Sequence, residues 1–128
     1  MGCGPGPGRG IPLSEYQEQV TDAIMTVSGD DYTFVANHTI LPEEEIIFGA
    51  TDTLTINADV DVILEGKLYV IDETDAITRI TVEGTLTMGD GSEIEICGII
   101  TNAGIGISVN TGGEFTQNAG GDIRITTV

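Results

Sequence analysis

Residues 52–97 form three successive lines, DTLTINADVDVILE (52–65), GKLYVIDETDAITRITVE (66–83) and GTLTMGDGSEIEIC (84–97). Two further lines, GIITNAGIGISVNTG (98–112) and GEFTQNAGGDIRITTV (113–128), continue the pattern. Each line opens with Gly or Asp, and a large apolar residue follows two positions later: Leu54, Leu68, Leu86, Ile100 and Phe115, at successive spacings of 14, 18, 14 and 15. This internal repeat decides the fold class.

Each line contains a short strand, a polar turn and a second strand with alternating apolar residues, as in Val60-x-Val62-x-Leu64. Two architectures fit this pattern. Each line could be one coil of a β-solenoid, with equivalent positions stacked, or the lines could form hairpins of an antiparallel meander or sandwich. Four of the five lines open with Gly, as a coil corner requires, and the apolar register recurs between lines. The sequence therefore favours an all-β chain, a short β-solenoid of stacked two-strand repeats.

The segment before the repeat divides into two parts. Residues 1–11 are rich in Gly and Pro, which predicts a flexible arm, whereas residues 12–51 are expected to supply one helix and the strands that cap the repeat region at 52–128. The helix is predicted over 14–27, with Ser14 and Gln17 as a capping box and Ser28-Gly29 as its end. The pattern also allows residues 26–28 to be extended. No cap is visible after Val128, which suggests a subunit contact there.

Charge excludes several classes of partner. The chain of 128 residues has 21 acidic and 4 basic side chains and a formal net charge of −17. Nucleic acids and anionic membranes both require clusters of Lys and Arg, so we expect neither as a partner. The N-terminal MGCGPGPGRG lacks the apolar segment of a secretory signal, and Gly6 stands where a myristoylation motif has Ser or Thr.

Catalytic and metal-binding patterns are weak. His38 is the single histidine and has no visible nucleophile partner, so a structural role is expected. The nearest calcium candidates, residues 90–93 (DGSE) and Asp59-x-Asp61, match neither the EF-hand loop nor the Gly-rich calcium repeat. The acidic run 43–45 is read as a solvated turn. We therefore predict no enzyme activity, no metal site and no cofactor.

The two cysteines, Cys3 and Cys97, do not constitute a disulfide framework. Both could be free thiols. Alternatively, because Cys3 lies in the predicted arm, it could reach Cys97 of a neighbouring subunit and form a bridge between copies.

The stretches Glu65–Asp72 and Glu83–Met88, with the lead-in Tyr32–Pro42, resemble rungs of the β-solenoid segments in virion proteins of tailed bacteriophages. Such segments occur in fibres and in capsid decoration (cement) proteins, and similar rungs occur in bacterial surface adhesins. The resemblance implies homo-oligomers, with a trimer favoured, that are attached to a major capsid protein or another virion protein. It also implies attachment through an N-terminal arm, which here would use Gly2, Cys3, Gly4, Pro5, Pro7 and Arg9.

The sequence thus predicts a non-enzymatic structural protein of a viral particle, most specifically a capsid decoration protein that stabilises the shell. The alternative is an adhesin or fibre-type module at a cell surface that recognises a carbohydrate or a receptor. A minor tail or baseplate component fits the same sequence features as the decoration protein.

Overall fold

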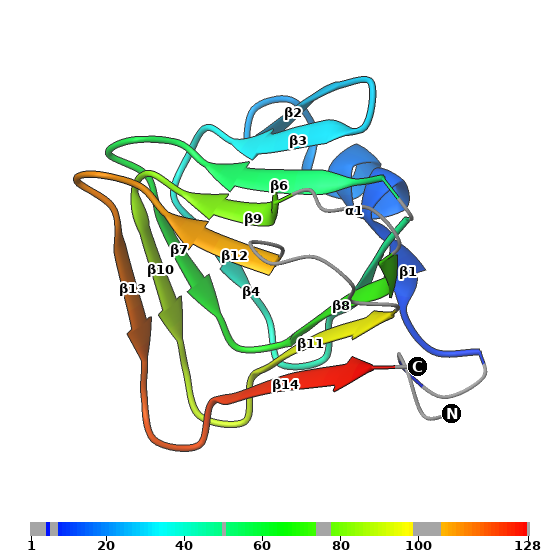
Figure 1. Ribbon diagram of the computed structural model, residues 1–128. Helices are drawn as coiled ribbons and strands as arrows, with labels where there is room; N and C mark the ends of the chain where they lie inside the picture. The colour runs from blue at the N-terminus through cyan, green and yellow to red at the C-terminus, as the bar shows by residue number, and fades with distance from the viewer. Residues whose placement is uncertain (1–4, 6–7, 50, 74–77, 99–105, 128) are drawn as a thin grey trace.

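The computed structural model describes residues 5, 8–49, 51–73, 78–98 and 106–127, which form one short helix and a series of short strands (Figure 1). The helix is α1 (Leu13–Val20). The strands are β1 (Ile11–Pro12), β2 (Met25–Ser28), β3 (Asp31–Phe34), β4 (His38–Ile40), β5 (Glu45–Phe48), β6 (Thr53–Ile56), β7 (Asp61–Leu64), β8 (Lys67–Glu73), β9 (Thr78–Val82), β10 (Thr85–Met88), β11 (Glu93–Gly98), β12 (Gly106–Val109), β13 (Glu114–Gln117) and β14 (Asp122–Thr127).

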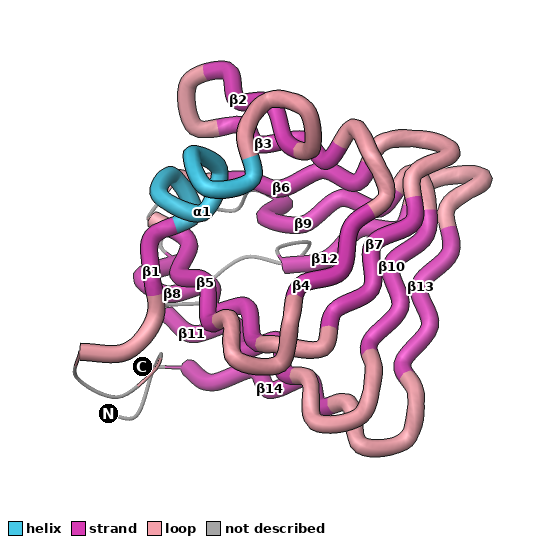
Figure 2. Tube along the Cα trace, turned by 180° about the vertical axis from the view of Figure 1, so that it is seen from behind, coloured by secondary structure: helices cyan, strands magenta, loops and turns pink. Residues whose placement is uncertain are grey.

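The strands form three sheets that wrap around one core, as Figures 1 and 2 show from opposite sides. We call them sheet A (β1-β5-β8-β11-β14), sheet B (β12-β9-β6-β3-β2) and sheet C (β13-β10-β7-β4). Every described strand pair is parallel except β2 with β3. The chain passes from sheet B to sheet C to sheet A in each coil. This confirms the predicted all-β solenoid with one helix and excludes the antiparallel meander or sandwich.

The coil, however, has three strands and not the two predicted from the repeat. Leu54 pairs with Ile80 in sheet B, whereas Leu86 pairs with Val62 and Phe115 in sheet C. The 14- to 18-residue lines therefore place their leading apolar residues on different walls of the solenoid. Because each strand-turn-strand unit rounds only one or two corners of a triangle, it does not complete a coil. The first coil, β3 to β5, already lies before Asp52.

The core consists of apolar columns, in which equivalent positions of successive coils stack. In sheet A, for example, Ile46, Leu68 and Ile94 are in register and at most 1% exposed. Parallel pairing at about 4.8 Å places these side chains in continuous contact. Burying each Leu or Ile contributes about 1.5–3 kcal/mol, so the columns dominate the stability of the coil stack.

Glycine at three corners is required by the close approach of the neighbouring coil. A Cβ atom added at Gly66 would lie 2.2 Å from the Glu44 carbonyl oxygen, and one at Gly84 would lie 2.3 Å from that of Asn57. At Gly113 the carbonyl oxygen of Val82 would be 2.3 Å away. These three residues open predicted lines, so the expectation that glycine marks coil corners is confirmed for them, whereas Gly98, which opens the fourth line, is the last residue of strand β11.

The helix is shorter than predicted. It ends at Val20, and Thr21 has a positive φ of 71°. Met25–Ser28 form β2, an antiparallel partner of β3, so the helix predicted over 14–27 was too long and the alternative of an extended 26–28 is confirmed. Pairing along the free edge of β3 satisfies backbone groups that a longer helix would leave open, and Thr and Val favour the extended state.

The predicted capping box is also wrong. Pro12 occupies the N-cap position of α1, and no side chain caps the first turn. The side chain of Ser14 instead lies near that of Tyr32. The fixed φ of Pro12 suits the start of the helix without a side-chain cap.

We expect Gly84→Ala to lower the free energy of unfolding by about 1–3 kcal/mol, because the new methyl group would overlap backbone of the preceding coil. Urea denaturation measures this directly. The matched control is Gly89→Ala, whose Cβ would lie 3.6 Å from its nearest neighbours and should change little. Equal stability of the two variants would contradict the corner argument.

Candidate functional site

The first end of the solenoid is closed. Helix α1 packs against β1, β2 and β5 (Figure 2), and its residues Leu13 and Tyr16 are completely buried. The edge of sheet A at this end is β1, which has two residues and contains Pro12. A short edge strand with a proline offers few free donors to another chain. Sheets B and C end there in β2 and β4. The apolar residues of the first coil are buried at this end, with Phe34, Ile40 and Ile46 at most 1% exposed.

A partly buried group of hydrogen-bonded side chains fixes the helix to the first coil. The Tyr16 hydroxyl lies 2.7 Å from Nε2 of His38 and donates to Oε1 of Glu44 at 2.9 Å. A hydroxyl has one proton, so Nε2 of His38 must donate to the Tyr16 oxygen. Glu44 also accepts from the Leu41 backbone N–H at 2.8 Å, and the Phe34 ring stacks on His38 with centroids 5.6 Å apart.

Burial changes the proton affinity of both rings in this group. It raises the pKa of Tyr16, and the nearby Glu44 raises it further. It lowers the pKa of His38 below 6.5, and the opposing effect of Glu44 is smaller. Both side chains are therefore held neutral near pH 7. His38 has the structural surroundings that its isolation in the sequence suggested, but the reading of the whole run 43–45 as a solvated turn was wrong for Glu44 and Glu45, since both are partly buried.

The lowered pKa of His38 predicts a pH-dependent stability. Since the unfolded chain takes up a proton near pH 6.5 and the folded chain does so only at lower pH, unfolding is favoured as pH falls through this range. We expect the melting temperature to fall from about pH 7 to about pH 5. His38→Gln should reduce this slope. Because carboxylates titrate in the wild type and in the variant, the quantity to compare is the difference between their two curves of melting temperature against pH. Identical curves would contradict the role given to His38.

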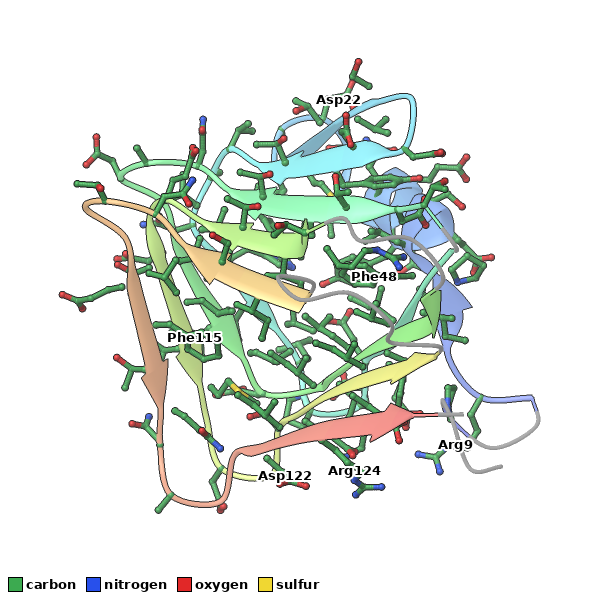
Figure 3. All side chains as sticks on the ribbon, in the orientation of Figure 1. Arg9, Asp22, Phe48, Phe115, Asp122 and Arg124 are labelled. Atoms are coloured by element: carbon green, nitrogen blue, oxygen red, sulfur yellow. The ribbon has the colours of Figure 1, made fainter. Side chains whose placement is uncertain are left out.

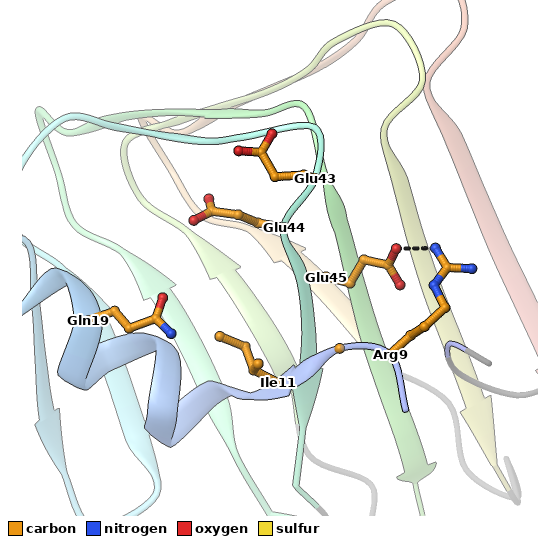
Figure 4. A pocket seen from close by; sticks show the side chains of 7 residues that line it. Arg9, Ile11, Gln19, Glu43, Glu44 and Glu45 are labelled. Carbon is orange, nitrogen blue, oxygen red and sulfur yellow. Dashed lines mark hydrogen bonds and ion pairs between the residues drawn. The ribbon is translucent and has the colours of Figure 1, made fainter. Parts of the chain in front are cut away.

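The described part of the predicted arm packs back on the protein's own surface. Arg9 forms an ion pair with Glu45 (Figure 4), and Gly10 lies beside the Ile47 side chain. Together with α1 and the acidic corner, this segment lines an open pocket of about 300 Å³: Arg9, Gly10, Ile11, Gln19, Glu43, Glu44 and Glu45. One oxygen of Glu45 is buried there and has no hydrogen-bond partner among the described residues. The contacts of residues 9 and 10, at the base of the arm, are thus made within the same chain.

The remaining predicted attachment residues are only partly visible. Pro5 is described and lies close to Gly10, whereas Gly2, Cys3, Gly4 and Pro7 lie outside the described residues. Cys97 belongs to β11 and pairs with Thr126 of β14, but its side chain is outside the described part of the chain. The predicted bridge between Cys3 and Cys97 therefore stays a prediction.

The second end of the solenoid is open in the described structure. β12, β13 and β14 are the last strands of their sheets, and no described strand pairs with their outer edges. Ile107, Phe115 and Ile123 are only partly buried, whereas Ile80, Leu86 and Ile94, their neighbours in the same columns, are at most 1% exposed. Val109 is 46% exposed. This end presents apolar side chains and backbone groups that pair with no strand among the described residues.

Charged side chains surround the open end. Arg124 lies on the outer face of β14, 56% exposed, with ion pairs to Glu93 at 3.1 Å, Asp122 at 3.7 Å and Glu95 at 3.9 Å. Figure 3 shows Arg124 directed away from the core and Phe115 directed into it. Glu114 is exposed at the start of β13.

The chain was compared with protein-family models, curated proteins and solved structures, and none of them matches it. Among the described residues, no helix is long and apolar enough to cross a membrane.

The two calcium candidates lie at different corners of the coil. Residues 89–92 turn from sheet C to sheet A, where the Ser92 hydroxyl donates to the Gly89 carbonyl at 2.7 Å. Asp59 and Asp61 lie at the corner from sheet B to sheet C, beside an open acidic pocket of about 490 Å³. Within the described ranges, no group of three or more metal-binding side chains is assembled.

A row of hydroxyl side chains crosses the outer face of sheet B. Its members are in register on five neighbouring strands: Thr26, Thr33, Thr55, Thr81 and Ser108. All five are at least partly exposed. The stacking of coils makes this face flat and periodic, with one hydroxyl group per strand.

Sequence reasoning missed the three groups that shape the two ends. Tyr16 was read only as part of an apolar helix stripe, and its partners His38 and Glu44 are 22 and 28 residues away. Arg124 and Glu114 carry no local motif. Their relation becomes visible only when the last coil is known, because β13 and β14 belong to different walls.

Proposed function

We propose that this protein is a non-enzymatic structural component of a viral particle, specifically a decoration protein that stabilises the shell. The observation that carries the proposal is the asymmetry of the solenoid. Both ends have three edge strands, but helix α1 packs at the first end, where the apolar columns stay buried, whereas the columns at the second end are partly exposed. Such an element is suited to being held by neighbours in an assembly.

The packing of the coil also supports a scaffolding role. The inward-facing residues of the inner coils form columns of aliphatic and aromatic side chains, and such close packing makes the coil stack rigid. The resemblance of Glu65–Asp72 and Glu83–Met88 to bacteriophage β-solenoid rungs selects a virion among the possible assemblies. The acidic surface, with 21 acidic side chains against 4 basic ones, would complement a positively charged lattice.

On this proposal, the N-terminal arm engages the shell while its base stays fixed by the ion pair between Arg9 and Glu45. A deletion of residues 2–8 keeps this pair. We expect the truncated protein to keep its melting temperature but to lose binding to particles stripped of the native protein. Co-sedimentation with the particles measures binding, and the full-length protein is the control.

Immunogold electron microscopy of particles from the source should place the protein at regular positions on the shell. Its absence from all particle fractions would contradict the proposed function. Full binding by the truncated protein would contradict only the role of the arm.

The hydroxyl row of sheet B favours a second candidate, a binding module for a cell-surface carbohydrate. A flat row of exposed Thr and Ser hydroxyl groups can donate and accept hydrogen bonds at regular intervals. A glycan array distinguishes this candidate. Binding that is lost in Thr55→Val, a nearly isosteric change at the centre of the row, would favour it over the decoration protein.

A further inference from the structure

The open end has to be covered by something that pairs with strand edges. The outer edges of β12, β13 and β14 carry N–H and C=O groups without described strand partners, and the last coil exposes part of its apolar columns. A folded protein that displays these features is prone to edge-to-edge pairing. The occupant must therefore offer strand edges and apolar side chains.

A second copy of this chain can offer both, but only with its own open end. At the first end, α1 packs against the coil and β2 runs antiparallel to β3, so head-to-tail stacking could not continue all three sheets as parallel ones. Two open ends can face one another across a two-fold axis. Because such an axis reverses the direction of the strands, the edges would meet as antiparallel pairs.

The triangular cross-section limits where this axis can pass. An axis through the corner between sheets A and C, at residues 118–121, exchanges these two sheets and maps sheet B onto itself. It places β13 of each copy opposite β14 of the other copy, and it places the two β12 strands opposite one another. All three open edges of each copy are then paired.

The residues of β13 and β14 are complementary in this arrangement. In an antiparallel pair, residues directly opposite one another point to the same face. Aligning the inward-facing Phe115 with Ile123 of the second copy extends the apolar core across the junction. The same register places Glu114 opposite Arg124 of the second copy on the outer face, and Thr116 opposite Asp122.

The pairing of Glu114 with Arg124 is the main argument for a second copy of this chain as the partner. Arg124 is one of only 4 basic residues in a chain with 21 acidic ones. More than half of its side chain is exposed although it already forms ion pairs with Glu93, Glu95 and Asp122, and its five N–H donors leave room for another carboxylate. Two copies with a net charge of −17 each would repel one another unless such a contact offset the repulsion.

We propose that the protein forms an isologous dimer through the open end of its solenoid, with β13 paired to β14 of a second copy and Glu114 paired to Arg124 across the junction. This proposal deepens the proposed function, because it names what covers the open end before or during assembly. It differs from the trimer that the bacteriophage resemblance implies.

A reciprocal charge exchange tests the proposal. Glu114→Arg and Arg124→Glu each place like charges opposite one another, so each variant alone should dimerise at least about tenfold more weakly than the wild type. An equimolar mixture of the two should form a heterodimer, because both junction pairs are then oppositely charged. Sedimentation velocity over a concentration series measures all three states, and circular dichroism checks that each variant is folded.

Two controls keep the result specific. Glu18→Arg introduces the same charge change on the exposed face of α1, at the closed end, and should dimerise as the wild type does. Asp122→Arg tests an alternative in which β14 pairs with itself. If Asp122→Arg disrupted the dimer while Glu114→Arg did not, the proposed register would be wrong. A wild-type protein that is monomeric or trimeric at all concentrations would overturn the proposal, while the particle-labelling experiment would still test the proposed function.

Discussion

The parallel, in-register pairing of successive coils is the constraint on which the rest of the structure depends. Because each residue lies beside its equivalent in the next coil, every inward position must be apolar in every coil, as Ile46, Leu68 and Ile94 illustrate. The same stacking brings corner backbones within reach of one another and leaves no room for a side chain at Gly66 or Gly84. The core, the corners and the periodic outer faces all follow from this one pairing rule.

A stack of coils necessarily has two ends, and this protein treats them differently. At the first end, the hydrogen bonds of Tyr16 with His38 and Glu44 fix a helix across the coil, and β2 covers the edge of β3. At the second end, the last coil carries Phe115 and Ile123 in positions that are buried in the coils before it. The asymmetry, more than any single residue, suggests a component that works in contact with a neighbour.

The sequence predicted the features that are local and repeated. Alternating apolar residues identified the strands, and the glycines at 66, 84 and 113 correctly marked the coil corners. The number of strands per coil was missed because Leu54 and Leu68 follow similar turns. The local sequence does not indicate by what angle each turn changes the direction of the chain. The helix was overextended because residues 25–28 continue its apolar stripe, although pairing with β3 satisfies their backbone groups better. The buried partners of Tyr16 and the charges around the open end join residues from different walls, which only the coil register brings together.

Hydrogen–deuterium exchange at high and low protein concentration tests the central claim, that the open end is an interface and the closed end is not. If the open ends pair, the amides of β13 and β14 should exchange more slowly in concentrated solution, while those of β1 and β4, at the closed end, should be unaffected. Exchange that is independent of concentration throughout, or protection gained at the closed end, would contradict this view of the molecule.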